Sequence, residues 1–187
     1  MTSIVTTAVS MNTQKIHPKL AETIHSLSLS SVSEERKRIL QPLVDYLKNK
    51  KEKQDTIQLN FICTHNSRRS QLSQVWAQTA AYCYGIPVSC FSGGVEVTAC
   101  NERVIKCLKN QGFQISTSEE KNNPVYLVSF AETAKPTQLF SKSFDDHTNP
   151  KEGFAAIMTC SDADANCPFV PGTEKRISIT YEDPKAF

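Results

Sequence analysis

A cysteine and an arginine stand six positions apart in the segment 63–70, and a hydroxyl residue follows the arginine directly. The segment consists of Cys63, Thr64, His65, Asn66, Ser67, Arg68, Arg69 and Ser70. A cysteine thiolate is a strong nucleophile, and a guanidinium offers a planar pair of N–H donors that matches two oxygens of a tetrahedral anion. The spacing therefore predicts that Cys63 faces an oxyanion clamped by Arg69.

The flanking sequence indicates how this segment is positioned. Residues 57–62 form an apolar run typical of a buried strand, and an amphipathic helical pattern begins near Ser70. In a loop between a strand and a helix, backbone N–H groups and the positive end of the helix dipole can converge on one centre. We expect the loop 64–69 to bind the oxyanion and to favour the ionised form of Cys63. The alternative is an ordinary buried cysteine followed by surface arginines.

The other side chains of the loop have different expected roles. Ser70 is placed to donate to the sulfur of Cys63, and Asn66 to fix the loop through bonds to the backbone. Arg68 adds positive charge at the mouth of the site, or is a solvated residue at the start of the helix. His65 is expected to contribute its backbone N–H rather than its ring.

Two further cysteines, Cys160 and Cys167, stand seven residues apart. In a continuous helix they would share a face but lie roughly 10 Å apart along the axis. A disulfide requires Cα atoms within about 7 Å. A bond between them therefore requires the segment to unwind or loop out. Two inert thiols are one alternative; a zinc site is weaker, because the spacing is unusual for zinc and no suitable histidine lies nearby.

Strands and helices alternate from residue 57 onward. The expected strands are 57–62, 88–92, 155–160 and 177–180, with helices over 69–84 and 101–111. This alternation predicts an α/β fold with a parallel, doubly wound, flavodoxin-like sheet. Ligands of such sheets bind at the carboxyl ends of the strands, where Cys63, Cys160 and Asp183 all fall.

The regions outside this alternation suggest two additions. A helix is predicted from Pro18, and a second from the capping-box pattern of Ser31 and Glu34, with Pro42 kinking or restarting it. Residues 124–130 and 138–144 are expected to form a β-hairpin that extends the sheet or leans over the active site.

These features divide the chain into two parts. We assign residues 1–55 to an N-terminal tail and helical extension. Residues 56–187 then form the α/β domain, with an insert at about 122–153.

Composition limits the classes of function. The 187 residues are 39% hydrophobic and 21% charged, as in soluble globular proteins, and the formal charge of +2 gives no reason to expect nucleic-acid binding. No apolar stretch approaches 18 residues, and no secretory signal is recognisable, so we expect no membrane association. Four of the seven cysteines fall in apolar patterns and are expected to be free buried thiols, which fits a cytoplasmic location: Cys83, Cys90, Cys100 and Cys107.

Three blocks of sequence resemble the low-molecular-weight protein tyrosine phosphatase superfamily, and within it the thioredoxin-coupled arsenate reductases. The blocks are 61–71, then 91–96 with Asn101, and finally 160–168 with Glu182, Asp183 and Pro184 beyond. The resemblance covers about residues 56–121 and 154–186. The third block discriminates between the two groups, because plain phosphatases of the superfamily usually lack the cysteine pair.

The resemblance implies a mechanism. The Cys63 thiolate would attack arsenate, Cys160 would attack Cys63 with release of arsenite, and Cys167 would attack Cys160 to leave a disulfide for thioredoxin. Asp183 would be the general acid that protonates the leaving oxygen; a loop aspartate that caps a turn is the alternative. No bound cofactor and no metal are expected. Some relatives hold potassium near Asn66, but a lysine at position 121 would repel a cation here.

Two other functions remain open. The same loop and acid could hydrolyse phosphotyrosine through a phosphocysteine intermediate, since arsenate and phosphate are close in shape. The chain could also be a non-catalytic oxyanion-binding module.

Overall fold

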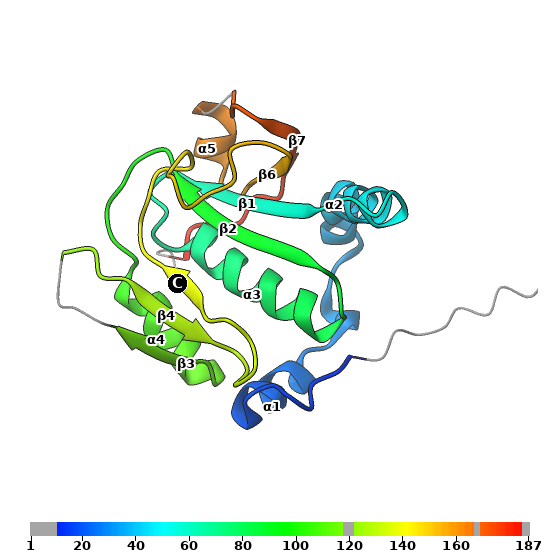
Figure 1. The fold of residues 1–187 in the computed structure, drawn as a ribbon, viewed down its shortest axis with the longest axis vertical. Helices are drawn as coiled ribbons and strands as arrows, with labels where there is room; N and C mark the ends of the chain where they lie inside the picture. Colours follow the sequence, from blue (N-terminus) through cyan, green and yellow to red (C-terminus); the bar gives the residue numbers. More distant parts are fainter. Residues whose placement is uncertain (1–10, 118–121, 167–168, 185–187) are drawn as a thin grey trace, which may run out of the picture.

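The computed structural model describes residues 11–117, 122–166 and 169–184, and its centre is a four-stranded parallel sheet (Figure 1). The strands are β1 (Ile57–Cys63), β2 (Val88–Gly94), β6 (Phe154–Met158) and β7 (Thr173–Ser178). Their order is β2-β1-β6-β7, and each neighbouring pair is parallel. This is the flavodoxin-like order, so the predicted fold class is confirmed. The last strand begins at Thr173, earlier than expected.

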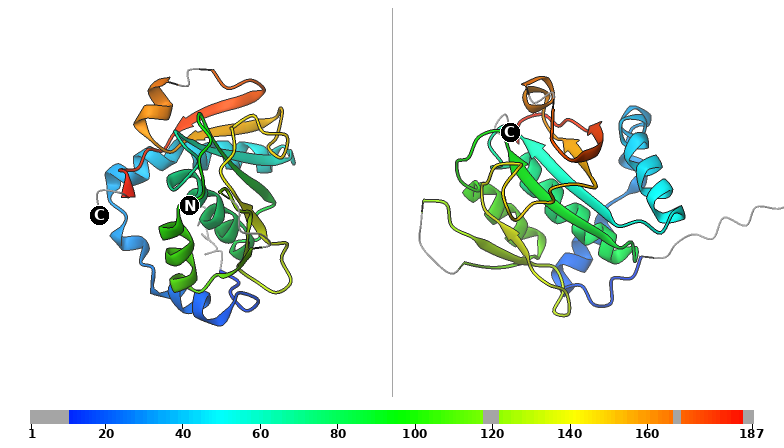
Figure 2. Two further views of the ribbon diagram at one scale, coloured as in Figure 1. Left: turned by 90° about the vertical axis from the view of Figure 1, so that its left-hand side faces the viewer. Right: turned by 45° about the horizontal axis from the view of Figure 1, so that its top comes forward.

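The side chains of the strands alternate between the two faces of the sheet. One face packs on α2 (Glu34–Glu52) and α3 (Arg69–Cys83) and includes Leu59, Phe61, Ile157 and Ile177. The other face lies against α5 (Ser161–Asn166) and includes Ile62, Ala156 and Met158. Figure 2 shows the sheet between these layers. The carboxyl ends of β1 and β6 therefore emerge between α3 and α5.

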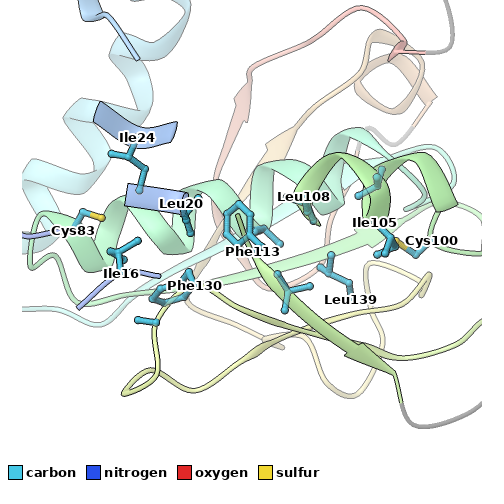
Figure 3. Packing of buried hydrophobic residues seen from close by; sticks show 14 residues of the cluster. Ile16, Leu20, Ile24, Cys83, Cys100, Ile105, Leu108, Phe113, Phe130 and Leu139 are labelled. Carbon is cyan, nitrogen blue, oxygen red and sulfur yellow. The ribbon is translucent and has the colours of Figure 1, made fainter. Parts of the chain in front are cut away.

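A second sheet lies beyond α3. It is antiparallel, in the order β3-β4-β5, and consists of β3 (Gln114–Thr117), β4 (Tyr126–Ser129) and β5 (Thr137–Leu139). With α1 (Pro18–Ser26) and α4 (Glu102–Gln111) it encloses a separate apolar cluster (Figure 3), which includes Leu20, Val75, Leu108, Phe113 and Phe130.

The predicted hairpin is present as β4 and β5, but it does not extend the parallel sheet. It pairs instead with β3, which the sequence analysis did not predict. The expected strand 138–144 ends at Leu139, and the segment 140–144 crosses to the end of β2, where Phe144 N donates to Gly94 O at 3.0 Å.

The second helix begins later than predicted. Ser33, not Ser31, is the N-cap of α2, because its hydroxyl accepts from Arg36 N at 3.1 Å, whereas the hydroxyl of Ser31 donates to Ser28 O. The helix continues through Pro42. Within the described residues, no helix is both long and apolar enough to cross a membrane.

The prediction of buried thiols holds for three of the four cysteines. Cys83, Cys90 and Cys100 are buried, but Cys107 is exposed. The reason is that α4 turns Val104, Ile105 and Leu108 towards the core, which places Cys107 on the opposite side of the helix.

Candidate active site

Cys63 is the last residue of β1, and α3 begins only six residues later at Arg69. The Cys63 side chain is buried, and its sulfur lies 3.0 Å from the hydroxyl oxygen of Ser70. This contact matches the one expected from the sequence. A hydroxyl that donates to a sulfur stabilises the charged form of that sulfur.

Asn66 holds the shape of the loop. Its backbone has a φ of +45°, in the left-handed region that asparagine tolerates better than most residues. Its side-chain amide donates to the hydroxyl of Ser70 at 2.8 Å, and its side-chain carbonyl accepts from the backbone N–H of Lys142 at 3.0 Å. The backbone carbonyl of Asn66 accepts from the side chain of Gln71 at 2.7 Å. One buried side chain thus links the loop to both α3 and the segment after the hairpin.

The backbone carbonyl groups from Cys63 to Arg68 all accept hydrogen bonds from within the protein. Their donors are Val95 N, Glu96 N, the Ser141 hydroxyl, the Gln71 side chain, Asn101 N and Leu72 N. In a trans peptide the next N–H points opposite to the carbonyl. The N–H groups of the loop are therefore directed away from these partners, and they are the groups that could bind an oxyanion.

The end of β2 contacts this loop directly. A Cβ atom added to Gly94 would lie 2.6 Å from Asn66 N and 2.7 Å from Glu96 O. Backbone therefore packs on backbone at this point, and only glycine leaves enough room.

Asp183 lies beside both arginines of the loop. Arg68 Nη2 is 3.2 Å from each carboxylate oxygen of Asp183, and Arg69 Nη2 is 3.5 Å from one of them. Arg69 Nη1 also donates to the backbone carbonyl of Tyr181 at 3.1 Å. The structure therefore brings three predicted site residues together, although Asp183 is more than 110 positions from both arginines in the sequence.

Cys160 lies beside the same loop. It is fully buried in one apolar cluster with Cys63, and its sulfur is 3.5 Å from the hydroxyl oxygen of Thr64. The backbone N–H of Ala163, in the first turn of α5, donates to this sulfur at 3.4 Å. Its predicted partner Cys167 lies outside the described residues.

The remaining loop side chains point outward. His65 Nε2 is 3.2 Å from a carboxylate oxygen of Glu96, and both side chains are at least half exposed. The hydroxyl of Ser67 donates to Ala99 O at 2.6 Å. Among the described residues, no group of three or more His, Cys, Asp or Glu side chains is arranged to hold a metal ion.

Comparisons with known proteins identify the family of the chain. No protein-family model matches the chain. The arsenate reductase of Staphylococcus aureus strain Newman is 30% identical over 125 residues, which cover 66% of this chain and 76% of the relative. The chain belongs to the arsenate reductase family.

Other arsenate reductases are similar to the chain as well. Arsenate reductase 2 of Staphylococcus haemolyticus strain JCSC1435 is 28% identical over 124 residues, again 66% of this chain and 76% of the relative. A solved structure, the thioredoxin-dependent arsenate reductase Cg_ArsC1' of Corynebacterium glutamicum, is 22% identical, with a TM-score of 0.41. That comparison covers 89% of this chain and 64% of the solved one.

The helix α5 is attached to β7 through Asp164. Asp164 lies in the middle of α5; one of its carboxylate oxygens is 2.7 Å from Arg176 Nη2, and the other accepts from the hydroxyl of Ser178. Burial alone would raise the pKa of Asp164, but the hydrogen bonds from Ser178 and Arg176, with the charge of Arg176, bring the pKa below its usual value. The ion pair therefore helps to hold α5, which directly follows Cys160, against β7.

Burial shifts the pKa of two other thiols and of one lysine. It raises the pKa of Cys90 and Cys100 to about 12, so both stay protonated at neutral pH. Burial also lowers the pKa of Lys142 to about 8, despite the opposing charge of Asp146. Lys142 is only 5% exposed and lies directly after Ser141, which contacts the loop.

Three residues at this site were missed by the sequence analysis. Ser141 and Lys142 lie where a strand was expected, and their pattern gave no sign of contact with the loop. Tyr181 attracted no notice because it acts here through its backbone carbonyl, which every residue has.

Proposed function

We propose that the protein reduces arsenate to arsenite through a relay of three cysteines, with a thioredoxin-like dithiol as the reductant. The names of the similar proteins support the reaction. The observation that carries the relay is the burial of Cys160 against the loop of Cys63, beside Thr64. A second thiol so close to the first is what a disulfide exchange needs, and a simple phosphoester hydrolysis has no use for it.

The first step forms a bond between sulfur and arsenic. The loop N–H groups and Arg69 hold the arsenate, the Cys63 thiolate attacks arsenic, and an oxygen leaves as water after protonation by Asp183. Because Asp183 already contacts Arg69, the entering oxyanion shares that guanidinium with the acid. The position of the Asp183 carboxylate beside Arg68 and Arg69 supports this role.

The second step reduces arsenic. The Cys160 thiolate attacks the sulfur of Cys63 and forms a disulfide, while the electron pair of the broken sulfur–arsenic bond stays on arsenic, which leaves as arsenite. Cys167 then attacks Cys160 and returns Cys63 to the thiolate. The Cys160–Cys167 disulfide is reduced by the external dithiol, which is itself oxidised.

Two assays on four proteins test this proposal. We would measure thioredoxin-dependent arsenate turnover and the hydrolysis of p-nitrophenyl phosphate for the parent, Cys63→Ser, Cys160→Ser and Cys167→Ser. The relay predicts that all three variants lose arsenate turnover, and that only Cys63→Ser loses the hydrolysis. Full arsenate turnover in Cys160→Ser would exclude the relay.

The second candidate function is hydrolysis of phosphotyrosine. The position of Asp183 against the two loop arginines favours it, because the same acid could protonate a phenolate leaving group. Hydrolysis without any arsenate turnover would identify a dedicated phosphatase. Phosphate that protects Cys63 from iodoacetamide, with activity in neither assay, would identify a binding module.

A further inference from the structure

The segment that carries Asp183 has little secondary structure of its own. It follows the end of β7 at Ser178, and its backbone is tied to the sheet by Tyr181 N, which donates to Thr159 O at 3.1 Å. Beyond Tyr181, the Asp183 carboxylate pairs with the two loop arginines, and 39% of the aspartate side chain is exposed. Partly exposed pairs contribute only modestly to holding a segment. Whatever holds residues 180 and 181 therefore also contributes to the orientation of Asp183.

An arginine from the N-terminal part of the chain holds this segment from the other side. Arg36 Nη1, in the first turns of α2, donates to the backbone carbonyl of Thr180 at 2.8 Å. The guanidinium carbon of Arg36 also lies 4.0 Å from the centre of the Tyr181 ring, a cation–π contact. Since Arg69 donates to the Tyr181 carbonyl, residues 180 and 181 lie between two guanidiniums, one from α2 and one from α3.

The helix that carries Arg36, α2, is itself attached to the parallel sheet. Towards its other end, α2 is linked to β7: Tyr46 donates to Glu174 at 3.2 Å, and Lys50 lies 2.7 Å from the same carboxylate. Arg36 Nη2 is buried and has no hydrogen-bond partner within the part of the chain that the structure describes. Burying that N–H group is unfavourable, so the contacts with Thr180 and Tyr181 must offset it.

We propose that Arg36 is a positioning residue for the reaction, which holds Thr180 and Tyr181 so that the Asp183 carboxyl stays at the loop. Arg36 touches no reacting atom and acts only through this segment. The inference rests on the proposed function, in which Asp183 protonates the leaving oxygen. The inference thus gives α2, in the N-terminal part of the chain, a role in the reaction.

The experiment compares Arg36→Met with Arg38→Met, the same change two residues away at an exposed position. We would measure kcat and KM for two aryl phosphates, phenyl phosphate and p-nitrophenyl phosphate. Phenolate is the poorer leaving group and depends more on protonation. Arg36→Met should lower kcat for phenyl phosphate about tenfold or more and for p-nitrophenyl phosphate by much less, while KM changes little. Arg38→Met should change neither.

A general loss of structure would look different. It would lower kcat for both esters to the same extent, and that result, or no fall at all, would overturn the inference. Thermal unfolding of each variant shows whether it is folded at the assay temperature. If Arg36→Met does not fold, Arg36→Lys replaces it: lysine keeps the charge but loses the planar fork and the stacking on Tyr181. The same difference between the two esters is then expected.

A double-mutant cycle with Asp183→Asn separates this inference from the proposed function. If Arg36 acts through Asp183, then Arg36→Met should lower kcat less than twofold once Asp183→Asn is present. Independent, multiplicative effects would overturn the inference. If Asp183→Asn lowers kcat for both esters to the same extent, or for neither, then Asp183 is not the general acid. The inference about Arg36 then fails as well. Should neither ester be hydrolysed, the cycle is read on thioredoxin-dependent arsenate turnover, with the same expected non-additivity.

Discussion

Cys63 and Cys160 are the first two thiols of the proposed reaction, and each is followed by a segment next to the site. The loop after Cys63 and the helix α5 after Cys160 are held in different ways. The loop is fixed by donors from the end of β2, the start of α4, α3 and the segment after the hairpin, and Asn66 joins several of them. The helix α5 has only six residues, and its polar attachment to the sheet runs through Asp164.

The proposed relay requires different properties of the two thiols. A loop that stabilises charge on an oxyanion works best when its donors are already in place before the substrate arrives. A fully buried thiol that must later react with an external dithiol has to become accessible. Segments that open locally are those with few buried contacts. The contrast therefore suggests a fixed first site and a releasable second one.

The largest effect is expected from a change in the loop after Cys63, the more firmly held of the two segments. Asn66→Ala removes the bonds to Ser70 and Lys142 and leaves buried groups unpaired, so the free energy of unfolding should fall by about 3 kcal/mol. The loop should lose its shape, and arsenate turnover should fall by about 100-fold or more. Urea unfolding and a turnover assay well below the unfolding temperature check both points. Near-parental turnover in this variant would contradict the view that the loop is held by Asn66.

A second change probes the charge buried next to the loop. The pKa of Lys142 is about 8 in the folded protein and 10.5 ordinarily, so between these pH values the unfolded chain binds more protons, and stability rises with pH. Below pH 8 the buried charge costs about 3 kcal/mol. Lys142→Met should therefore be more stable than the parent at pH 7, by about 2 kcal/mol, and the advantage should shrink towards pH 10. Guanidinium unfolding at both pH values measures it; an advantage that does not change with pH would contradict the burial of charge.

Ser70→Ala tests the contact with the nucleophile, and it also removes the acceptor of the Asn66 side-chain amide. The loss of a hydrogen bond to a charged sulfur should lower the rate of iodoacetamide alkylation at Cys63 at pH 7, and arsenate turnover, by about tenfold. Ser73→Ala, one turn away on the same helix, is the matched control and should behave like the parent. Equal alkylation rates in the two variants would show that Ser70 does not stabilise the thiolate.

The smallest effect is expected from a change in α5, the less firmly held of the two segments. Asp164→Asn removes the charge that attaches α5 to Arg176, and this partly exposed pair is worth about 1 kcal/mol, so Cys160 should be alkylated about fivefold faster. The measurement is mass spectrometry of the Cys160 peptide in the Cys63→Ser background. Asp162→Asn, on the exposed side of the same helix, should leave the rate unchanged. If both variants match the parent, α5 is not held by Asp164.

The strand, the loop and the first residues of the site could be predicted because their signals are local. An apolar run followed by a helical pattern places Cys63 at a strand end, and parallel strands bring the ends near Cys63, Cys160 and Asp183 to one edge. The second sheet could not be predicted, because β3 is mostly exposed and is defined by pairing with β4 rather than by an apolar pattern.

Contacts between residues far apart in the sequence could not be predicted either. Lys142 is a buried charge in a segment that looks like a strand. Its backbone N–H donates to the side-chain carbonyl of Asn66, 76 positions away. Arg36 reads as one more charge on an amphipathic helix, and only the folded chain places it on Thr180, 144 positions later. Patterns along the sequence report which face is apolar; they do not report which distant carbonyl a side chain will reach.

The close approach of Gly94 to the loop has a consequence for how this family can vary. Any side chain at that position would push against main-chain atoms of His65 and Asn66, which cannot rotate away as a side chain could. A change at position 94 therefore cannot be accommodated by repacking its neighbours, and would have to be matched by a new path for the whole loop. Selection for activity should retain glycine there even while the residues around it diverge.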